Sequence, residues 1–156
     1  MNNQQTAENV NSVTEFVAPL PSPSVFLIWL PTLLWTTMLC VFSTESFGYS
    51  HTFSVMTAIH AHIPHALGFL NPRLLNLIAR KGAHFSIYVG YFFVLVTGPL
   101  RGRPWTAFLI CMLAGSCDEI HQIFVPGRTA SPYDVGIDSS GAMFARLAYL
   151  GFIEAV

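Results

Sequence analysis

Residues 24–42 read SVFLIWLPTLLWTTMLCVF and contain no charged side chain. A helix that crosses a bilayer needs about 20 consecutive, mostly apolar residues, so the sequence predicts a membrane-spanning helix here. Pro31 lies early in this stretch, where a proline is expected to kink a spanning helix rather than end it. The protein is therefore expected to have lipid as the solvent for at least one helix.

The composition of the whole chain agrees with that expectation. Of its 156 residues, 53% are hydrophobic and 10% are charged, whereas soluble domains contain roughly 25% charged residues. So many apolar residues exclude disorder for most of the chain, and a net charge of −1 excludes the basic surface of a nucleic-acid binder. No cofactor is expected. The three cysteines lack disulfide or metal spacing and are expected to be buried free thiols: Cys40, Cys111 and Cys117.

Three further segments are interpreted as membrane spans: 80–99, 104–123 and 134–152. Together with 24–42 they predict an all-α fold, a polytopic membrane protein with a four-helix transmembrane bundle in one domain, 24–156. Residues 1–23 are rich in Asn, Gln, Ser, Thr and Pro and are predicted to form a disordered tail.

The segment between the first two spans, 43–79, is predicted to hold an interfacial helix. Apolar residues recur there at steps of three and four, as in a helix that lies on the membrane with its polar side in water: Phe53, Met56, Ile59, Ile63 and Leu67. The segment also carries His51, His60, His62 and His65. We expect these histidines to be solvated, because the last three do not share one helical face and so do not form a metal site.

The orientation of the bundle is predicted from its short loops. Arg101 and Arg103 lie in the tight turn between the second and third spans, which places that turn in the cytoplasm. Both termini are then expected to be cytoplasmic, in what is expected to be a bacterial cell membrane. Four other basic residues lie on the opposite side of the membrane: Arg73, Arg80, Lys81 and Arg128. Three of these four are interpreted as candidate site residues.

Several ionisable residues fall inside the predicted spans. A charged side chain at mid-bilayer costs roughly 2.5–3.5 kcal/mol on insertion scales, so such residues are functional candidates when they face protein or water. Each of three spans presents polar residues on one helical face: Lys81, His84 and Tyr88 in the second, Asp118, Glu119 and Gln122 in the third, and Asp134 and Asp138 in the fourth.

These polar faces are predicted to meet. The start of the second span, the end of the third and the start of the fourth lie at the same membrane face, and Arg128 lies in the loop that joins the last two. We therefore predict one polar cluster just below the outer interface, in which opposite charges offset much of the desolvation cost. Within it, Arg128 or Lys81 is expected to neutralise Asp138, unless the pKa of that carboxyl is raised.

Four motifs in this region carry a family resemblance: Arg80-Lys81-Gly-Ala-His84-Phe-Ser-Ile-Tyr88, Asp118-Glu119-Ile-His121-Gln122, Pro126-Gly127-Arg128, and Asp134 with Gly141. In this order and spacing the chain resembles the VanZ-like family, integral membrane proteins associated with resistance to the glycopeptide antibiotic teicoplanin. The resemblance implies a role in the cell envelope and does not imply a reaction. Two positions depart from the family pattern, Asp138 (commonly asparagine) and Ile87 (often acidic).

Three functions are open for the cluster. In the first, it binds or masks a lipid-linked or peptidoglycan-like ligand, with Arg128 and Lys81 pairing to a carboxylate or phosphate. The other ligand-binding candidates are Tyr88, Gln122, Asp134 and Asp138, with contact area from Tyr91 and Tyr133. In the second, it is purely structural, a buried polar network that fixes how the helices pack.

The third function is hydrolysis of a lipid-linked or cell-wall substrate. Glu119, near Lys81, would be the general base and His84 the acid, or His84 would bind a metal together with Asp118 and Glu119. No metal site is assigned, because no recognised metal-ligand spacing is present. The oligomeric state is left open.

Overall fold

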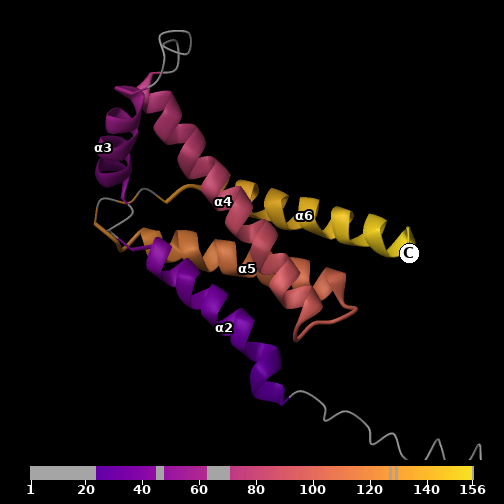
Figure 1. Ribbon diagram of the computed structural model, residues 1–156. Helices are drawn as coiled ribbons and strands as arrows, with labels where there is room; N and C mark the ends of the chain where they lie inside the picture. Colours follow the sequence, from indigo (N-terminus) through magenta and orange to yellow (C-terminus); the bar gives the residue numbers. More distant parts are fainter. Residues whose placement is uncertain (1–23, 45–47, 63–70, 127, 129, 156) are drawn as a thin grey trace, which may run out of the picture.

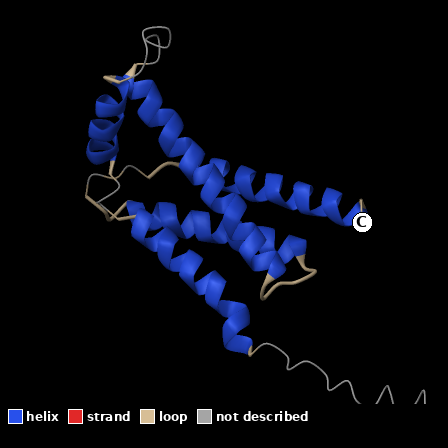
Figure 2. Ribbon diagram, in the orientation of Figure 1, coloured by secondary structure: helices blue, strands red, loops and turns tan. Residues whose placement is uncertain are grey.

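The computed structural model describes residues 24–44, 48–62, 71–126, 128 and 130–155. This part of the chain is all-α, as predicted, with loops between the helices (Figures 1 and 2). The helices are α2 (Val25–Phe42), α3 (Tyr49–His60), α4 (Pro72–Thr97), α5 (Pro104–Gln122) and α6 (Pro132–Glu154). The predicted tail, 1–23, lies outside the described residues.

The three long C-terminal helices each begin with a proline in the first turn, where its missing N–H is not needed. In α4 the Asn71 side chain also accepts a hydrogen bond from the backbone N–H of Leu74 at 2.8 Å, which caps the helix. The helix that contains the predicted second span therefore begins eight residues before residue 80, at Pro72. Residues 72–79, assigned to the interfacial segment, belong to α4, because nothing between this cap and Thr97 interrupts the helix.

The segment predicted to hold an interfacial helix contains a helix among its described residues, the 12 residues of α3. Phe53 and Met56 of its apolar stripe are half-buried, whereas Ile59 is exposed. Ile63, His65 and Leu67 lie outside the described residues. The structure thus contains a separate short helix between α2 and α4, and this helix packs against α4.

α4 is the central helix of the described structure, because it contacts each of the other four (Figure 1). Its buried face supplies most of the core, including Tyr88, Phe92 and Val96. α2 is joined to it by the Trp35 side chain, whose Nε1 donates a hydrogen bond to the Ile87 carbonyl at 3.1 Å. Residues of α4 therefore meet partners from all four of the other described helices.

Glycines bring the helix backbones close together at two crossings. A Cβ at Gly141 of α6 would overlap the backbone carbonyl of Phe85 in α4. A Cβ at Gly115 of α5 would lie 3.1 Å from the side chain of Asp138 in α6. Small residues at such crossings are typical of helices that pack in a membrane. Here they allow α4, α5 and α6 to pack closely around the acidic residue Asp138.

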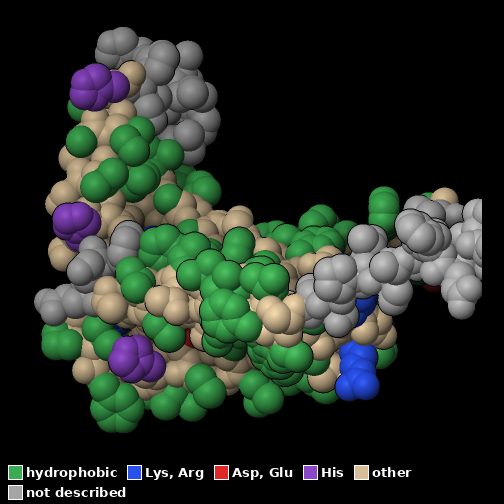
Figure 3. Space-filling view, turned by 60° about the horizontal axis from the view of Figure 1, so that its bottom comes forward, with side chains coloured by type: hydrophobic (Ala, Val, Ile, Leu, Met, Phe, Trp, Pro, Cys, Tyr) green, Lys and Arg blue, Asp and Glu red, His purple; other side chains and the backbone are tan. Residues whose placement is uncertain are grey.

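The outer surface is strongly apolar. Large hydrophobic side chains are exposed along α2, α5 and α6, and hydrophobic atoms dominate the face in Figure 3. α2 buries one residue, Thr32, and within the described residues it is the one helix long and apolar enough to cross a membrane by length and composition. The three other predicted spans do not meet this criterion, because α4, α5 and α6 all carry ionisable residues.

The three cysteines are free, as predicted. The prediction that they are buried is confirmed for Cys111 and is wrong for Cys40 and Cys117, which are exposed.

We expect Gly141→Ala to lower the free energy of unfolding by about 1–3 kcal/mol, because the added methyl group forces α6 away from α4. Gly136→Ala is the matched control in the same helix, since a Cβ there meets nothing within 4 Å. This control should be neutral or stabilising, because alanine is favoured over glycine in helices by about 0.5–1 kcal/mol. Thermal unfolding in detergent micelles measures both, and equal effects would contradict the close crossing.

Candidate functional site

Two ionic pairs join α4 to α6. The Lys81 ammonium group contacts the Asp134 carboxylate, and His84 Nδ1 lies 3.0 Å from Asp138 Oδ1. The pairs form a ladder because 81 and 84 are three residues apart on one helix, and 134 and 138 are four apart on the other. Both carboxylates are buried, Asp138 completely, so each depends on its partner for compensation.

α5 adds a second set of polar residues beside this ladder. Glu119 is 5% exposed, and its Oε2 accepts a hydrogen bond from the backbone N–H of Ser131 at 2.7 Å. The Gln122 amide donates to Asp118 Oδ2 at 2.8 Å. Because Ser131 immediately precedes α6, the Glu119 contact fixes where α6 starts relative to α5.

Arg128 hydrogen-bonds to the end of α2 rather than to a carboxylate of the predicted cluster. Its guanidinium donates hydrogen bonds to the backbone carbonyls of Phe42 and Thr44, at the C-terminal end of α2. Of the two alternatives left open for Asp138, an ion pair with Arg128 or Lys81 is not seen within the described residues; His84 pairs with Asp138 instead. Burial lowers the pKa of Arg128, and the nearby charge of Arg80 lowers it further.

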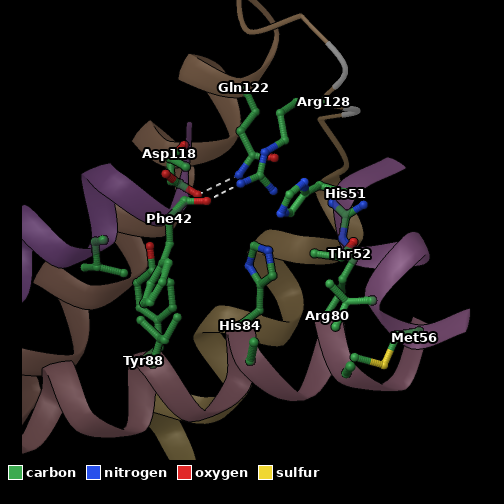
Figure 4. A pocket seen from close by; sticks show the side chains of 16 residues that line it. Phe42, His51, Thr52, Met56, Arg80, His84, Tyr88, Asp118, Gln122 and Arg128 are labelled. Atoms are coloured by element: carbon green, nitrogen blue, oxygen red, sulfur yellow. Dashed lines mark hydrogen bonds between the residues drawn. The ribbon is translucent and has the colours of Figure 1, made fainter. Parts of the chain in front are cut away.

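A pocket of about 410 Å³ opens where the end of α2, the helix α3, the middle of α4 and the end of α5 meet. Figure 4 shows His84 and Tyr88 on one wall, Asp118 and Gln122 on another, and Arg128 across the opening. The lining residues are Leu39, Phe42, Ser43, His51, Thr52, Val55, Met56, Ala79, Arg80, Ala83, His84, Ile87, Tyr88, Asp118, Gln122 and Arg128. Glu119 and Asp138 are not among them, and only His84 belongs to both the pocket wall and the buried pairs.

The VanZ/LLP1 family model matches residues 26–153. The chain belongs to the VanZ/LLP1 family. No curated protein and no solved structure gives a significant match. The polar residues described above all lie within the matched range, so they are features of a VanZ-family membrane protein.

In this VanZ-family chain, two of the remaining candidate residues, Tyr91 and Tyr133, lie outside the pocket lining. Tyr91 is 6% exposed and hydrogen-bonds through its hydroxyl with Thr36, so it lies in the core. Tyr133 is 84% exposed and does not line the pocket, which makes the expected contact area from these two tyrosines wrong. His51 lines the pocket and was missed, because the histidines of α3 were interpreted as solvated.

Three side chains of the VanZ-family site could hold a metal ion together. His84, Glu119 and Asp138 each offer one ligand atom, and these atoms lie within 4.8 Å of one another. The metal site that the sequence suggested as an alternative combined His84 and Glu119 with Asp118 rather than with Asp138. Asp118 is engaged with Gln122 at the pocket wall, and Asp138 takes the third position because α6 crosses so close to α5 and α4.

We expect Lys81→Met to lower the free energy of unfolding by about 1–3 kcal/mol, because it leaves the Asp134 carboxylate buried without a cation. The effect stays moderate because the Lys81 side chain is 36% exposed and solvent screens the pair. The double variant Lys81→Met/Asp134→Asn should regain much of the loss. Thermal unfolding of both single variants and the double variant completes the cycle, and strictly additive losses would argue against a coupled pair.

Proposed function

We propose that this VanZ-family protein binds an anionic amphiphile of the cell envelope, a lipid-linked or peptidoglycan-like molecule that carries a phosphate or carboxylate. The observation that carries the proposal is the pocket, which combines an apolar wall with two arginines. Binding or masking such a ligand is the means by which the protein would contribute to glycopeptide resistance.

The two arginines favour an anion. Arg80 and Arg128 both line the pocket and are close enough to affect each other electrostatically. Within the described residues neither forms an ion pair with a carboxylate: Arg80 stacks over the Tyr49 ring at 6.0 Å, and Arg128 donates to backbone carbonyls. Guanidinium groups match the geometry of phosphate and carboxylate, so an incoming anion would relieve their mutual repulsion.

The rest of the lining favours a hydrocarbon chain. Leu39 of α2, Val55 and Met56 of α3, and Ile87 of α4 all line the pocket. A volume of about 410 Å³ is within the range of small-molecule sites, which are mostly apolar with a few placed polar groups. One molecule with an acyl or prenyl chain and a charged head would satisfy both parts of this surface.

The proposal includes a membrane arrangement. We place α2, α4, α5 and α6 as four spans, α3 at the interface, and the pocket at the outer face, with both termini in the cytoplasm. The many exposed large hydrophobic side chains of the helices support contact with lipid on several sides, because soluble monomers rarely expose large apolar patches.

Topology is tested with single cysteines in a variant from which Cys40, Cys111 and Cys117 have been replaced. We expect a cysteine at Pro126 to react from outside with an impermeant thiol reagent, because the loop after α5 lies at the pocket end. A cysteine inserted between Gly102 and Arg103 should react only after the cells are permeabilised. Labelling of the second site in intact cells would reverse the proposed orientation.

Ligand binding is tested by mass spectrometry of lipids that co-purify with the protein. We expect Arg80→Gln and Arg128→Gln to retain at least about tenfold less of an anionic lipid-linked species, because each removes a charged contact. Arg103→Gln is the control, since Arg103 is exposed in the turn at the other end of α4. Monodisperse elution of each variant shows that it is folded.

Equal retention by Arg80→Gln, Arg128→Gln and the control would contradict the proposed ligand site. In cells, expression of the native protein in a teicoplanin-susceptible bacterium should raise the inhibitory concentration of the antibiotic. The pocket variants should not raise it, whereas the Arg103→Gln control should.

Hydrolysis is a second candidate, favoured by the contact of His84 with Asp138. A histidine on the pocket wall that is oriented by a buried carboxylate has the arrangement of a general base. Incubating the protein with the species that co-purifies distinguishes the two functions. Binding leaves that species intact, whereas hydrolysis releases products, and the release should stop in His84→Gln, which removes the base on the pocket wall.

A further inference from the structure

His84, Glu119 and Asp138 come from three different helices, α4, α5 and α6. One ligand atom from each lies within 4.8 Å of the other two. The donor atoms of a tetrahedral zinc site lie about 3.4 Å apart, so modest side-chain rotations would close the group around one ion. Such convergence of separate helices is how metal sites in helical bundles are built.

Within the part of the chain that the structure describes, two oxygens of this group have no hydrogen-bond partner. Glu119 Oε1 and Asp138 Oδ2 are both fully buried and unpartnered, while the other oxygen of each carboxylate is engaged, by the Ser131 N–H and by His84. A buried carboxylate oxygen without a partner is costly. Gly115 leaves the space beside Asp138 Oδ2 open, since a Cβ there would come within 3.1 Å of it.

The charges around the group also favour a cation. Lys81 is paired with Asp134, and Arg128 donates to backbone carbonyls. Of the side chains that the structure describes, only His84 forms an ionic contact with Asp138, and none does so with Glu119. Two buried carboxylates therefore share one imidazole, and a divalent ion would neutralise both.

We propose that His84, Glu119 and Asp138 form a binding site for one divalent transition-metal ion. The imidazole selects against Mg²⁺ and Ca²⁺, which prefer all-oxygen sites. One histidine with two carboxylates suits Zn²⁺, Mn²⁺ or Co²⁺, and three protein ligands leave a coordination position open for water or another ligand. Because His84 also lines the pocket, the ion would lie next to the wall of that pocket.

The site is tested with full-length protein in detergent micelles, purified without a histidine tag and treated with a chelator. Calorimetric titration with Zn²⁺ should show one ion per chain. Glu119→Gln and Asp138→Asn, which preserve shape, should each weaken Zn²⁺ binding at least about 100-fold, since loss of a direct ligand exceeds the effect of losing a supporting contact. Asp118→Asn is the matched control, because Asp118 is the neighbouring carboxylate outside the group, and it should change the affinity only a few-fold.

A second measurement covers the case in which a variant fails to fold. Co²⁺ bound to the native protein should give the visible absorption of a site with low coordination number, and millimolar Mg²⁺ or Ca²⁺ should not displace it. The proposal is overturned if the native protein takes up no Zn²⁺ or Co²⁺. It is equally overturned if Glu119→Gln and Asp138→Asn bind Zn²⁺ like the native chain, or if Mg²⁺ or Ca²⁺ binds more tightly than Zn²⁺.

Discussion

The close crossing of α6 over α4 at Gly141 is the contact on which the rest of the structure depends. With no side chain at this position, the α6 backbone lies against the Phe85 carbonyl, and the neighbouring residues of the two helices then meet in register. One turn before Gly141, Asp138 reaches His84, and one turn further Asp134 reaches Lys81. Close packing of the two backbones thus brings the buried charges within reach of their partners, and these pairs join α4 to α6.

The sequence predicted the polar faces of these helices better than their pairing. Helical periodicity places Asp134 and Asp138 on one side of α6, and both are buried. Helical periodicity does not give the position along each helix at which two helices cross. It therefore could not indicate which side chain forms an ionic contact with Asp138. The start of α4 was missed for a related reason. The span was predicted from an uncharged run, which is interrupted by Arg80 and Lys81, whereas the helix begins about two turns earlier, after the Asn71 cap.

Contacts between segments far apart in sequence gave no periodic signal. The periodicity of α3 indicated an apolar stripe that includes Met56, but it did not indicate that Met56, together with Val55, lines a pocket shared with α2 and α4. The guanidinium of Arg146 in α6 lies 3.5 Å from the ring centroid of Trp105 at the start of α5. A cation–π contact of this kind compensates a charge within an apolar helix. Residue spacing within a single helix cannot predict it, because its two partners lie on different helices.

His84 is the residue through which the pocket and the buried carboxylates are connected. It is 17% exposed in its side chain and lines the pocket, while its Nδ1 contacts the fully buried Asp138. A ligand head group at the pocket wall and an ion among the carboxylates would therefore act on one imidazole from opposite sides. The groups proposed to recognise the ligand, Arg80 and Arg128, form no ion pair with Glu119 or Asp138 among the described residues. Loss of ligand binding and loss of metal binding can thus be produced separately, although both sites share a histidine.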